Sequence, residues 1–196
     1  HITLINFKLR HICVFSIKKL MKSNKNLVFL GMMGSGKSSI GSLVAKKLKL
    51  DFIDVDKEIE KKIGISISKI FELKGEDYFR KIEEKITLNI LKINSTIISL
   101  GGGAFINKVI RKEIVKNHIS FWLNWNNEIL LNRIKNSKKR PIAFNLKENE
   151  LIDLIKKRSN IYSKALYEIK CDKLSKNEIT KQVLKKYETH QFKNKY

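Results

Sequence analysis

A glycine-rich segment near the start of the chain has the residue types and spacing of a phosphate-binding loop. Residues 31–38 read GMMGSGKS and satisfy the pattern G-x-x-x-x-G-K-[ST] in full. Backbone N–H groups of such a loop surround phosphate oxygens, while Lys37 is expected to reach the terminal phosphates and the Ser38 hydroxyl to ligate Mg²⁺. The expected nucleotide contacts in this segment are Gly34, Ser35, Gly36, Lys37, Ser38 and Ser39.

The sequence on either side of this loop has the context that the motif requires. The apolar run at residues 27–30 predicts a buried strand before the loop, and residues 38–48 carry apolar side chains at helical spacing after it. A glycine-rich turn with an incidental lysine would not need this context. The loop therefore predicts binding of ATP or GTP. Because the chain has no N-K-x-D guanine signature, a GTPase is disfavoured and a kinase of small molecules is expected.

Two aspartates follow the second apolar run, which reads FIDVD at residues 52–56. Asp54 and Asp56 flank Val55, so in an extended chain both side chains point the same way. One carboxylate would then serve the metal through water, and the other would meet a hydroxyl of the substrate. The pair is equally well explained as N-cap residues of a helix at residues 57–63. The spacing alone does not decide between these two interpretations.

Arginines are scarce in this chain, and a guanidinium offers a planar fork that lysine lacks. Six of the 41 basic residues are Arg. Arg80 lies three residues before a glutamate, a spacing that can orient its guanidinium on a helix. Arg140 precedes the only proline, inside a basic, polar segment at residues 135–150 that has the composition of a lid. Arg158 lies in a predicted helix. Arg111 is expected to be a solvated surface charge, and that alternative stays open for the others.

The composition fits one domain and excludes several classes of protein. The chain has 196 residues with an apolar fraction of 42%, and no apolar run is long enough to span a membrane. Cys13 and Cys171 lack the spacing of a metal site or a disulfide framework. This cysteine usage favours a reducing compartment, and we expect the cytoplasm.

The formal charge of +22 raises the question of a nucleic-acid partner. The lysines are spread along the whole chain, and no helix-turn-helix, zinc-finger or aromatic RNA-binding motif is present. We therefore expect no specific nucleic-acid binding, although a positive field would attract anionic substrates.

Residues 1–20 hold four basic and no acidic residues. We expect them to be an extension outside the domain of residues 21–196, either a targeting-type segment or sequence upstream of a start at Met21, which is favoured.

Short apolar runs alternate with amphipathic stretches along the chain. This alternation predicts an α/β fold with a parallel sheet and helices on both faces, in which ligands bind at the carboxyl ends of the strands. The expected strands are residues 27–30, 52–55, 96–100, 119–123 and 167–171. The expected helices are residues 38–48, 57–63, 67–73, 77–93, 128–134, 151–162 and 176–187.

Several segments, in order and spacing, resemble those of the shikimate kinases. They read FLGMMGSGKSSIG, FIDVD, YFRKIEE, SLGGGA and KRP, and the resemblance spans roughly residues 26–171. It implies transfer of the γ-phosphoryl group of ATP to the 3-hydroxyl of shikimate, in the pathway to chorismate and aromatic amino acids. It also implies the P-loop fold of the nucleoside monophosphate kinases, a three-layer sandwich with strand order 2-3-1-4-5 and a lid.

The resemblance also implies roles for individual residues. Asp56 would bind the shikimate hydroxyls and position or deprotonate the nucleophile, and Asp54 would join Ser38 in the Mg²⁺ shell. Arg140 would close with the lid and neutralise the transferring phosphoryl group, acting in catalysis beside Lys37, and Arg133 would stack near the adenine. The residues implied to bind shikimate are Asp56, Arg80, Gly101, Gly102, Gly103 and Arg158.

Some features depart from the pattern of that family. The lid is rich in Lys and Asn, and the segment after the fifth expected strand, CDKLSKNE, lacks the expected proline, so no adenine contact is assigned there. A gluconate or nucleoside monophosphate kinase is the alternative enzyme. A nucleic-acid-binding or regulatory protein on a nucleotide-binding fold is the alternative from another class. We expect a monomer that acts on ATP and shikimate.

Overall fold

The strand β1 (Leu27–Leu30) lies at the centre of a parallel sheet, because all four of its side chains are apolar and all four are buried. The computed structural model of the chain describes residues 24–136 and 146–193. Its sheet has five strands in the order β2–β3–β1–β4–β5, and every neighbouring pair is parallel. The predicted strand order is therefore confirmed. The other strands are β2 (Phe52–Asp54), β3 (Ile97–Ser99), β4 (Ile119–Asn124) and β5 (Tyr167–Lys170).

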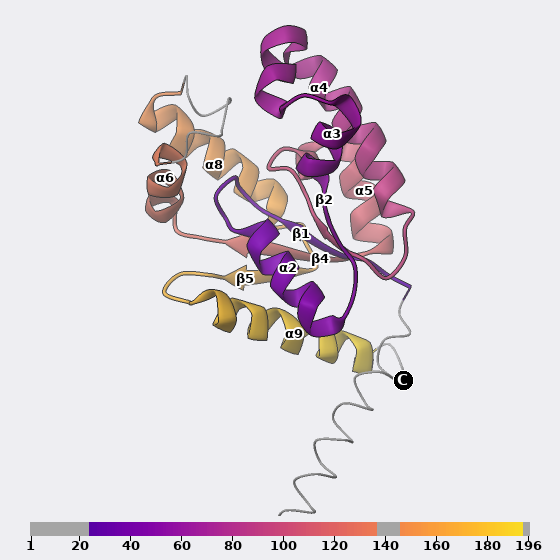
Figure 1. Cartoon of the computed structure of the whole chain (residues 1–196). Helices are drawn as coiled ribbons and strands as arrows, with labels where there is room; N and C mark the ends of the chain where they lie inside the picture. Colours follow the sequence, from indigo (N-terminus) through magenta and orange to yellow (C-terminus); the bar gives the residue numbers. More distant parts are fainter. Residues whose placement is uncertain (1–23, 137–145, 194–196) are drawn as a thin grey trace, which may run out of the picture.

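Helices cover both faces of this sheet (Figure 1). On one face α2 packs against α9, and on the other α5 packs against β4 and α4. Further contacts join α3 to α4 and α6 to α8. The expected three-layer α/β architecture is confirmed. The helices are α2 (Lys37–Leu48), α3 (Val55–Ile63), α4 (Ile67–Leu91), the 3-10 helix η1 (Ala104–Ile106), α5 (Lys108–Asn117), α6 (Asn127–Lys135), α8 (Glu148–Tyr162) and α9 (Lys176–Lys193).

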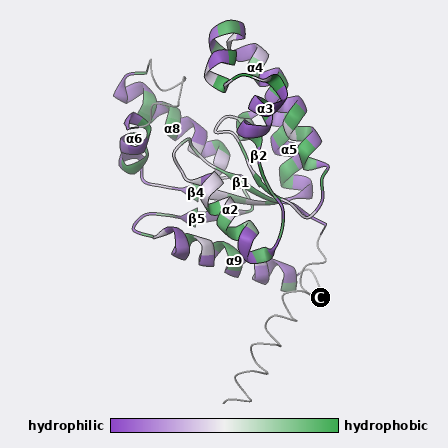
Figure 2. Cartoon of the chain, in the orientation of Figure 1, coloured by the Kyte–Doolittle hydropathy of each residue, from purple (hydrophilic) through white to green (hydrophobic). Residues whose placement is uncertain are grey.

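The core forms where side chains of neighbouring strands meet in register. Phe29 of β1 lies opposite Phe121 of β4, which in turn lies opposite Tyr167 of β5. Their rings stack with centroid separations of 5.6 and 5.4 Å. Figure 2 shows hydrophobic and hydrophilic residues alternating along α5 and α9, as helices that cover a sheet require. The parallel register thus places these three rings in one row on the face of the sheet that α9 covers.

The structure differs from the sequence-based expectation in a missed helix, in the end of a strand and in the join between two helices, besides small shifts at other element ends. Helix α5 is absent from the expected elements, although Ile110 and Ile114 are buried at helical spacing. Strand β2 ends at Asp54 and not at residue 55, because the Asp54 side chain caps α3 by accepting hydrogen bonds from two backbone N–H groups. Helix α4 covers the two helices that were expected, which meet at a kink where the backbone of Gly75 is non-helical, with φ at 77°.

The predicted lid at residues 135–150 is helical at both ends. Lys135 is the last residue of α6, and Glu148 is the first residue of α8. The Lys135 ammonium and the Glu148 carboxylate form an ion pair of 2.5 Å. The expected lid therefore includes the last residue of α6 and the first three residues of α8, and its role stays a prediction. Residues 137–145 of this segment, including Arg140, lie outside the described residues.

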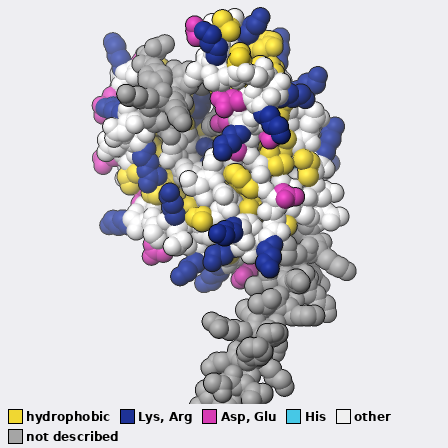
Figure 3. All heavy atoms as spheres, viewed as in Figure 1, with side chains coloured by type: hydrophobic (Ala, Val, Ile, Leu, Met, Phe, Trp, Pro, Cys, Tyr) yellow, Lys and Arg dark blue, Asp and Glu magenta, His cyan; other side chains and the backbone are white. Residues whose placement is uncertain are grey.

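The parallel sheet brings the segments that follow its strands to one edge. The phosphate loop follows β1, Asp54 closes β2, the triple glycine follows β3, and residues 171–175 follow β5. Among the described residues, no helix is long and apolar enough to cross a membrane. Figure 3 shows Lys and Arg side chains scattered over the visible face, without a single basic patch. The segments that follow the strands therefore meet at one edge of the sheet. The Lys and Arg side chains, in contrast, are distributed over the face that Figure 3 shows.

Candidate active site

The phosphate loop leaves its backbone donors available because no side chain caps the helix behind it. Gly36 is the N-cap of α2, with φ at 86°, and α2 has no side-chain cap hydrogen bond. The N–H groups of the first helical turn therefore point toward the loop with the positive end of the helix dipole. Lys37 is 8% exposed, and its ammonium donates to the carbonyl oxygens of Gly31 and Met32, at 3.0 and 3.1 Å. This geometry suits an anion.

Ser38 and Asp54 supply the oxygen atoms that a divalent cation would use. The Ser38 hydroxyl donates a hydrogen bond of 2.5 Å to Oδ2 of Asp54. The other carboxylate oxygen, Oδ1, accepts from the backbone N–H of Asp56, at 3.1 Å, and from that of Lys57. Asp54 is therefore both a helix cap and a neighbour of Ser38, so the N-cap interpretation is confirmed for it and the metal role stays a prediction. A hydroxyl and a carboxylate suit Mg²⁺, which takes few protein oxygens and completes its shell with phosphate and water.

Asp56 lies in the first turn of α3, so the extended-chain argument that places it beside Asp54 is wrong. The side chain instead faces the segment after β3. A Cβ added to Gly101 would lie 2.6 Å from Oδ1 of Asp56 and 2.7 Å from Oε1 of Glu83. Burial raises the pKa of Asp56 to about 6, with the charges of Asp54 and Glu83 adding to the shift and that of Lys37 opposing it. Asp56 is thus a carboxylate that can accept a proton near neutral pH.

Arg80 is held by two carboxylates of its own helix. Its Nη1 donates to Glu83 at 2.6 Å, and its Nη2 donates to Glu76 at 2.9 Å. Glu83 is 2% exposed, and burial raises its pKa although Arg80 lowers it. The predicted orientation of Arg80 by the glutamate three residues later is confirmed. Glu83 was expected only in that role, and the structure adds that it shares the space at Gly101 with Asp56.

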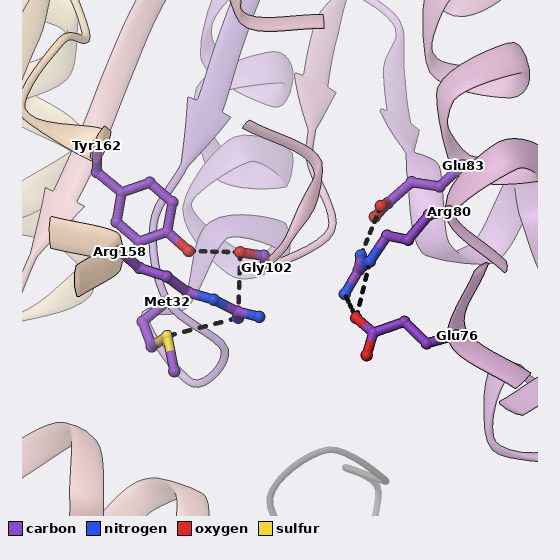
Figure 4. Close-up of polar contacts among 7 residues, drawn as sticks. All are labelled: Met32, Glu76, Arg80, Glu83, Gly102, Arg158 and Tyr162. Atoms are coloured by element: carbon purple, nitrogen blue, oxygen red, sulfur yellow. Dashed lines mark hydrogen bonds and ion pairs between the residues drawn. The ribbon is translucent and has the colours of Figure 1, made fainter. Parts of the chain in front are cut away.

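Arg158 faces this cluster from the opposite side, as Figure 4 shows. The residue is 9% exposed, and its Nη1 approaches the carbonyl oxygen of Gly102 at 3.5 Å and the sulfur of Met32 at 3.9 Å. The Tyr162 hydroxyl donates to the same carbonyl oxygen. Within residues 24–136 and 146–193, no carboxylate lies at ion-pair distance from Arg158. A nearly buried guanidinium without such a partner is suited to an anionic ligand.

Four side chains lie so close to the three glycines after β3 that little room is left for larger residues there. They are Asp56, Glu83, Arg80 and Arg158. A Cβ on Gly103 would overlap the Arg80 guanidinium, and one on Gly102 would lie 3.8 Å from Nη1 of Arg158. Any larger residue at Gly103 would therefore displace Arg80. The structure thus brings Asp56, Arg80 and Arg158 together around the triple glycine, as the sequence interpretation expects.

Arg133 lies on the other side of the phosphate loop, over the Trp125 ring. The guanidinium carbon is 3.7 Å from the ring centroid, and Nη1 is 3.4 Å from the carbonyl oxygen of Gly34. Both residues line a pocket of about 480 Å³, together with Gly34, Ser35, Gly36 and Ser39 of the loop. The structure brings Arg133 and the loop together as expected.

Three residues of this region escaped the sequence analysis. Trp125 and Tyr162 look like core aromatics in the sequence, and only their hydrogen bonds to Ser35 and Gly102 distinguish them. Leu174 lines the nucleotide-side pocket although no contact was assigned there.

Arg111 was expected to be a solvated charge. This is wrong, because its Nη1 donates to the carbonyl oxygens of Phe105 and Ile106 at the end of η1.

A phosphate loop with two arginines and an aspartate gathered beside it, around the triple glycine, fits a P-loop kinase that phosphorylates a small anionic acceptor. Comparisons with known proteins specify the class further. The family model for shikimate kinase matches residues 33–188. The chain is 36% identical to the shikimate kinase of Bartonella quintana over 185 residues, which cover 92% of this chain and 88% of that protein. The chain belongs to the shikimate kinase family, and the resemblance found in the sequence is confirmed.

Two further similarities cover nearly the same part of the chain. The shikimate kinase of Thermodesulfovibrio yellowstonii is 38% identical over 165 residues, covering 84% of this chain and 95% of that protein. The solved structure of the Acinetobacter baumannii shikimate kinase in complex with shikimate superposes with a TM-score of 0.80 at 30% identity. It covers 86% of this chain and 94% of that one.

Proposed function

We propose that this protein transfers the γ-phosphoryl group of ATP to the 3-hydroxyl of shikimate, giving shikimate 3-phosphate and ADP for the biosynthesis of chorismate and aromatic amino acids. The observation that carries this proposal is Arg158, a residue that is 9% exposed and has no ion pair in the described residues, with its guanidinium facing Arg80 across the triple glycine. Shikimate carries one carboxylate and three hydroxyls. A forked guanidinium of the protein suits the carboxylate of shikimate, and the carboxylate of Asp56 suits its hydroxyls.

On the nucleotide side, the backbone of the phosphate loop and the Lys37 ammonium would hold the β- and γ-phosphates. The contacts come from Gly34, Ser35, Gly36, Lys37, Ser38 and Ser39, with Arg133 near the base. Ser38 and Asp54 would hold Mg²⁺, which when bound neutralises charge on the phosphates. Arg140 would neutralise the transferring phosphoryl group, as the family resemblance implies.

On the acceptor side, Arg80 and Arg158 would bind the carboxylate while Gly101, Gly102 and Gly103 allow the ring to approach the backbone. Asp56 would accept a hydrogen bond from the 3-hydroxyl and align its oxygen with the γ-phosphorus. As the new phosphorus–oxygen bond forms, the bond from the γ-phosphorus to the bridging oxygen of ADP breaks. The hydroxyl proton passes to Asp56, whose pKa of about 6 permits it to accept and release that proton.

Several broader expectations remain part of the proposal. We propose a catalytic unit of residues 21–196, acting as a monomer without a specific nucleic-acid or membrane partner. The free, buried thiol of Cys171 agrees with a reducing compartment such as the cytoplasm.

A coupled assay of ADP release tests the reaction directly. Shikimate is offered as the acceptor, beside gluconate and nucleoside monophosphates as matched alternatives. We expect turnover with shikimate and less than a hundredth of that rate with either alternative. Turnover with gluconate or a nucleoside monophosphate in place of shikimate would overturn the proposal. Random duplex DNA is added in a parallel titration, and a tight, salt-sensitive complex indifferent to shikimate would favour the nucleic-acid alternative.

A further inference from the structure

The nucleotide side of the site contains an aromatic residue to which neither the loop motif nor the family resemblance gives a role. Trp125 follows β4 directly and is 9% exposed. Its indole N–H donates a hydrogen bond of 2.9 Å to the carbonyl oxygen of Ser35, within the phosphate loop. This bond joins residues 90 positions apart in the sequence. The indole ring is therefore held in a fixed place beside the loop.

One face of that ring carries the Arg133 guanidinium, whose Cζ lies 3.7 Å from the ring centroid. A second contact, from Nη1 to the carbonyl oxygen of Gly34 at 3.4 Å, restricts the rotation of the guanidinium. Arg133 is exposed and lines a pocket of about 480 Å³, so there is open space beside its guanidinium. A planar cation with one face on an indole ring can stack a second π-system on the other.

The pocket in front of this pair has the location that a nucleobase needs. It holds about 480 Å³ and is bounded by the phosphate loop on one side and by Leu174, Ser175 and Lys176 on the other. In ATP only the ribose separates the base from the phosphates. A nucleotide whose phosphates occupy the loop would therefore bring its base to Arg133.

We infer that Trp125 is a positioning residue for the nucleobase, holding the Arg133 guanidinium flat so that it stacks between the indole ring and the base of ATP. This inference rests on the proposed use of ATP. Trp125 acts through Arg133 and does not touch the base. An arginine without this support loses more side-chain freedom when a base stacks on it. Removing the indole ring is therefore expected to weaken nucleotide binding while sparing the acceptor.

The first test separates the base from the phosphates. Trp125→Leu removes both the ring and the N–H donor, whereas Trp125→Phe keeps an aromatic face without the donor. Affinities for ADP and for inorganic tripolyphosphate, which fills the loop but has no base, are measured by titration calorimetry. We expect Trp125→Leu to weaken ADP binding by about 3- to 10-fold and Trp125→Phe by less, with tripolyphosphate unchanged. An equal loss for both ligands would show that Trp125 acts on the loop through Ser35, and would overturn the inference.

A second test uses the fact that the chain has two tryptophans. In Trp122→Phe, Trp125 remains as the one tryptophan of the chain and reports on the stack. We expect ADP to change its fluorescence and tripolyphosphate to change it much less. The same change with both ligands would contradict a base at this position.

A double-mutant cycle tests whether Trp125 works through Arg133. Arg133→Lys keeps the charge on an exposed side chain but removes the planar face, so folding is not at risk. We expect it to weaken ADP binding, and we expect Trp125→Leu to add little to it. Fully additive losses would mean that the two residues act separately, and would overturn the inference. These binding measurements need no acceptor, so they remain decisive even if shikimate proves not to be phosphorylated.

Discussion

Asp56 occupies a position where its negative charge is costly to the fold and useful to the chemistry. It faces Gly101 beside the buried Glu83, and burial raises its pKa to about 6. Asp56→Asn keeps the size and one acceptor oxygen but cannot take up the proton of the hydroxyl. We expect kcat to fall by about 10²–10⁴, nearer the low end because phosphoryl transfer depends largely on positioning. Steady-state kinetics with shikimate, beside an ATP titration, measures this, and a kcat within threefold of wild type would contradict the role.

The raised pKa also predicts two pH dependences. The proton acceptor must be ionised, so kcat/KM for shikimate should fall below about pH 6 in the wild type. This fall at low pH should be absent in Asp56→Asn.

A carboxyl group whose pKa is raised by folding stabilises the fold at low pH and loses that contribution as pH rises through about 6. Asp56→Asn should therefore be more stable than wild type at pH 8, with the difference disappearing near pH 4. Urea unfolding at both pH values checks the sign.

Lys37 contributes a positive charge next to the phosphate site, where its ammonium already donates to two loop carbonyls. Lys37→Ala should nearly abolish turnover, because the terminal phosphates lose this charge. Lys47→Ala, an exposed residue later in the same helix, is the matched control and should leave kcat unchanged. Turnover of Lys37→Ala above about a tenth of the wild-type rate would refute the assignment.

Arg80 and Arg158 differ in their surroundings, and their variants should differ accordingly. Lysine at either position keeps the charge but loses the planar fork. Each change should raise KM for shikimate and leave KM for ATP within about twofold. The effect of Arg158→Lys should be larger, because Arg80 already binds Glu83 and Glu76 whereas Arg158 has no ion pair among the described residues. A higher KM for ATP with unchanged KM for shikimate would place these residues in the other pocket.

At the scale of elements, the small residues after β3 leave room for the side chains that we propose to bind the substrate. Gly103→Ala would force the Arg80 guanidinium to move, although the end of that flexible side chain can shift without unfolding the protein. We expect KM for shikimate to rise about tenfold, the effect of a displaced charge-assisted contact, with little change in Tm. Gly64→Ala is the matched control, since φ at 82° strains alanine but no atom lies near its Cβ. It should cost roughly 1–2 kcal/mol of stability and leave KM unchanged. The reverse pattern would show that the triple glycine serves only the fold.

At the scale of the whole molecule, His118 links the stability of the fold to pH. It is buried between α5 and β4, and within the described part of the chain its two ring nitrogens have no hydrogen-bond partner, although Nε2 lies 3.8 Å from Oε1 of Glu113. Burial lowers its pKa from 6.5, and the charge of Glu113 opposes this. The unfolded chain therefore binds the proton first, and stability should fall as pH drops below about 6.5. His118→Leu should weaken this dependence between pH 7 and pH 5.5, as measured by urea unfolding. An unchanged dependence would assign the effect to other groups.

The sequence by itself determined the features that depend on local spacing. A strand, a helix and eight positions between them, of which four are specified, define the phosphate loop, because its contacts come from consecutive backbone groups. The alternation of apolar runs and amphipathic stretches was sufficient for the α/β class. The strand order came with the family resemblance, as did the roles of Arg80 and Arg158.

The tertiary structure alone decided which distant residues share a site. Val55 begins a helix, so Asp56 turns from the face of Asp54 toward Gly101 and Glu83. Trp125 meets Ser35 because β4 lies directly beside β1 in the sheet, which places the residues that follow both strands at the same edge. Spacing along a chain specifies neighbours within one element. Contacts between elements depend on strand order and register, which pack residues tens of positions apart against one another.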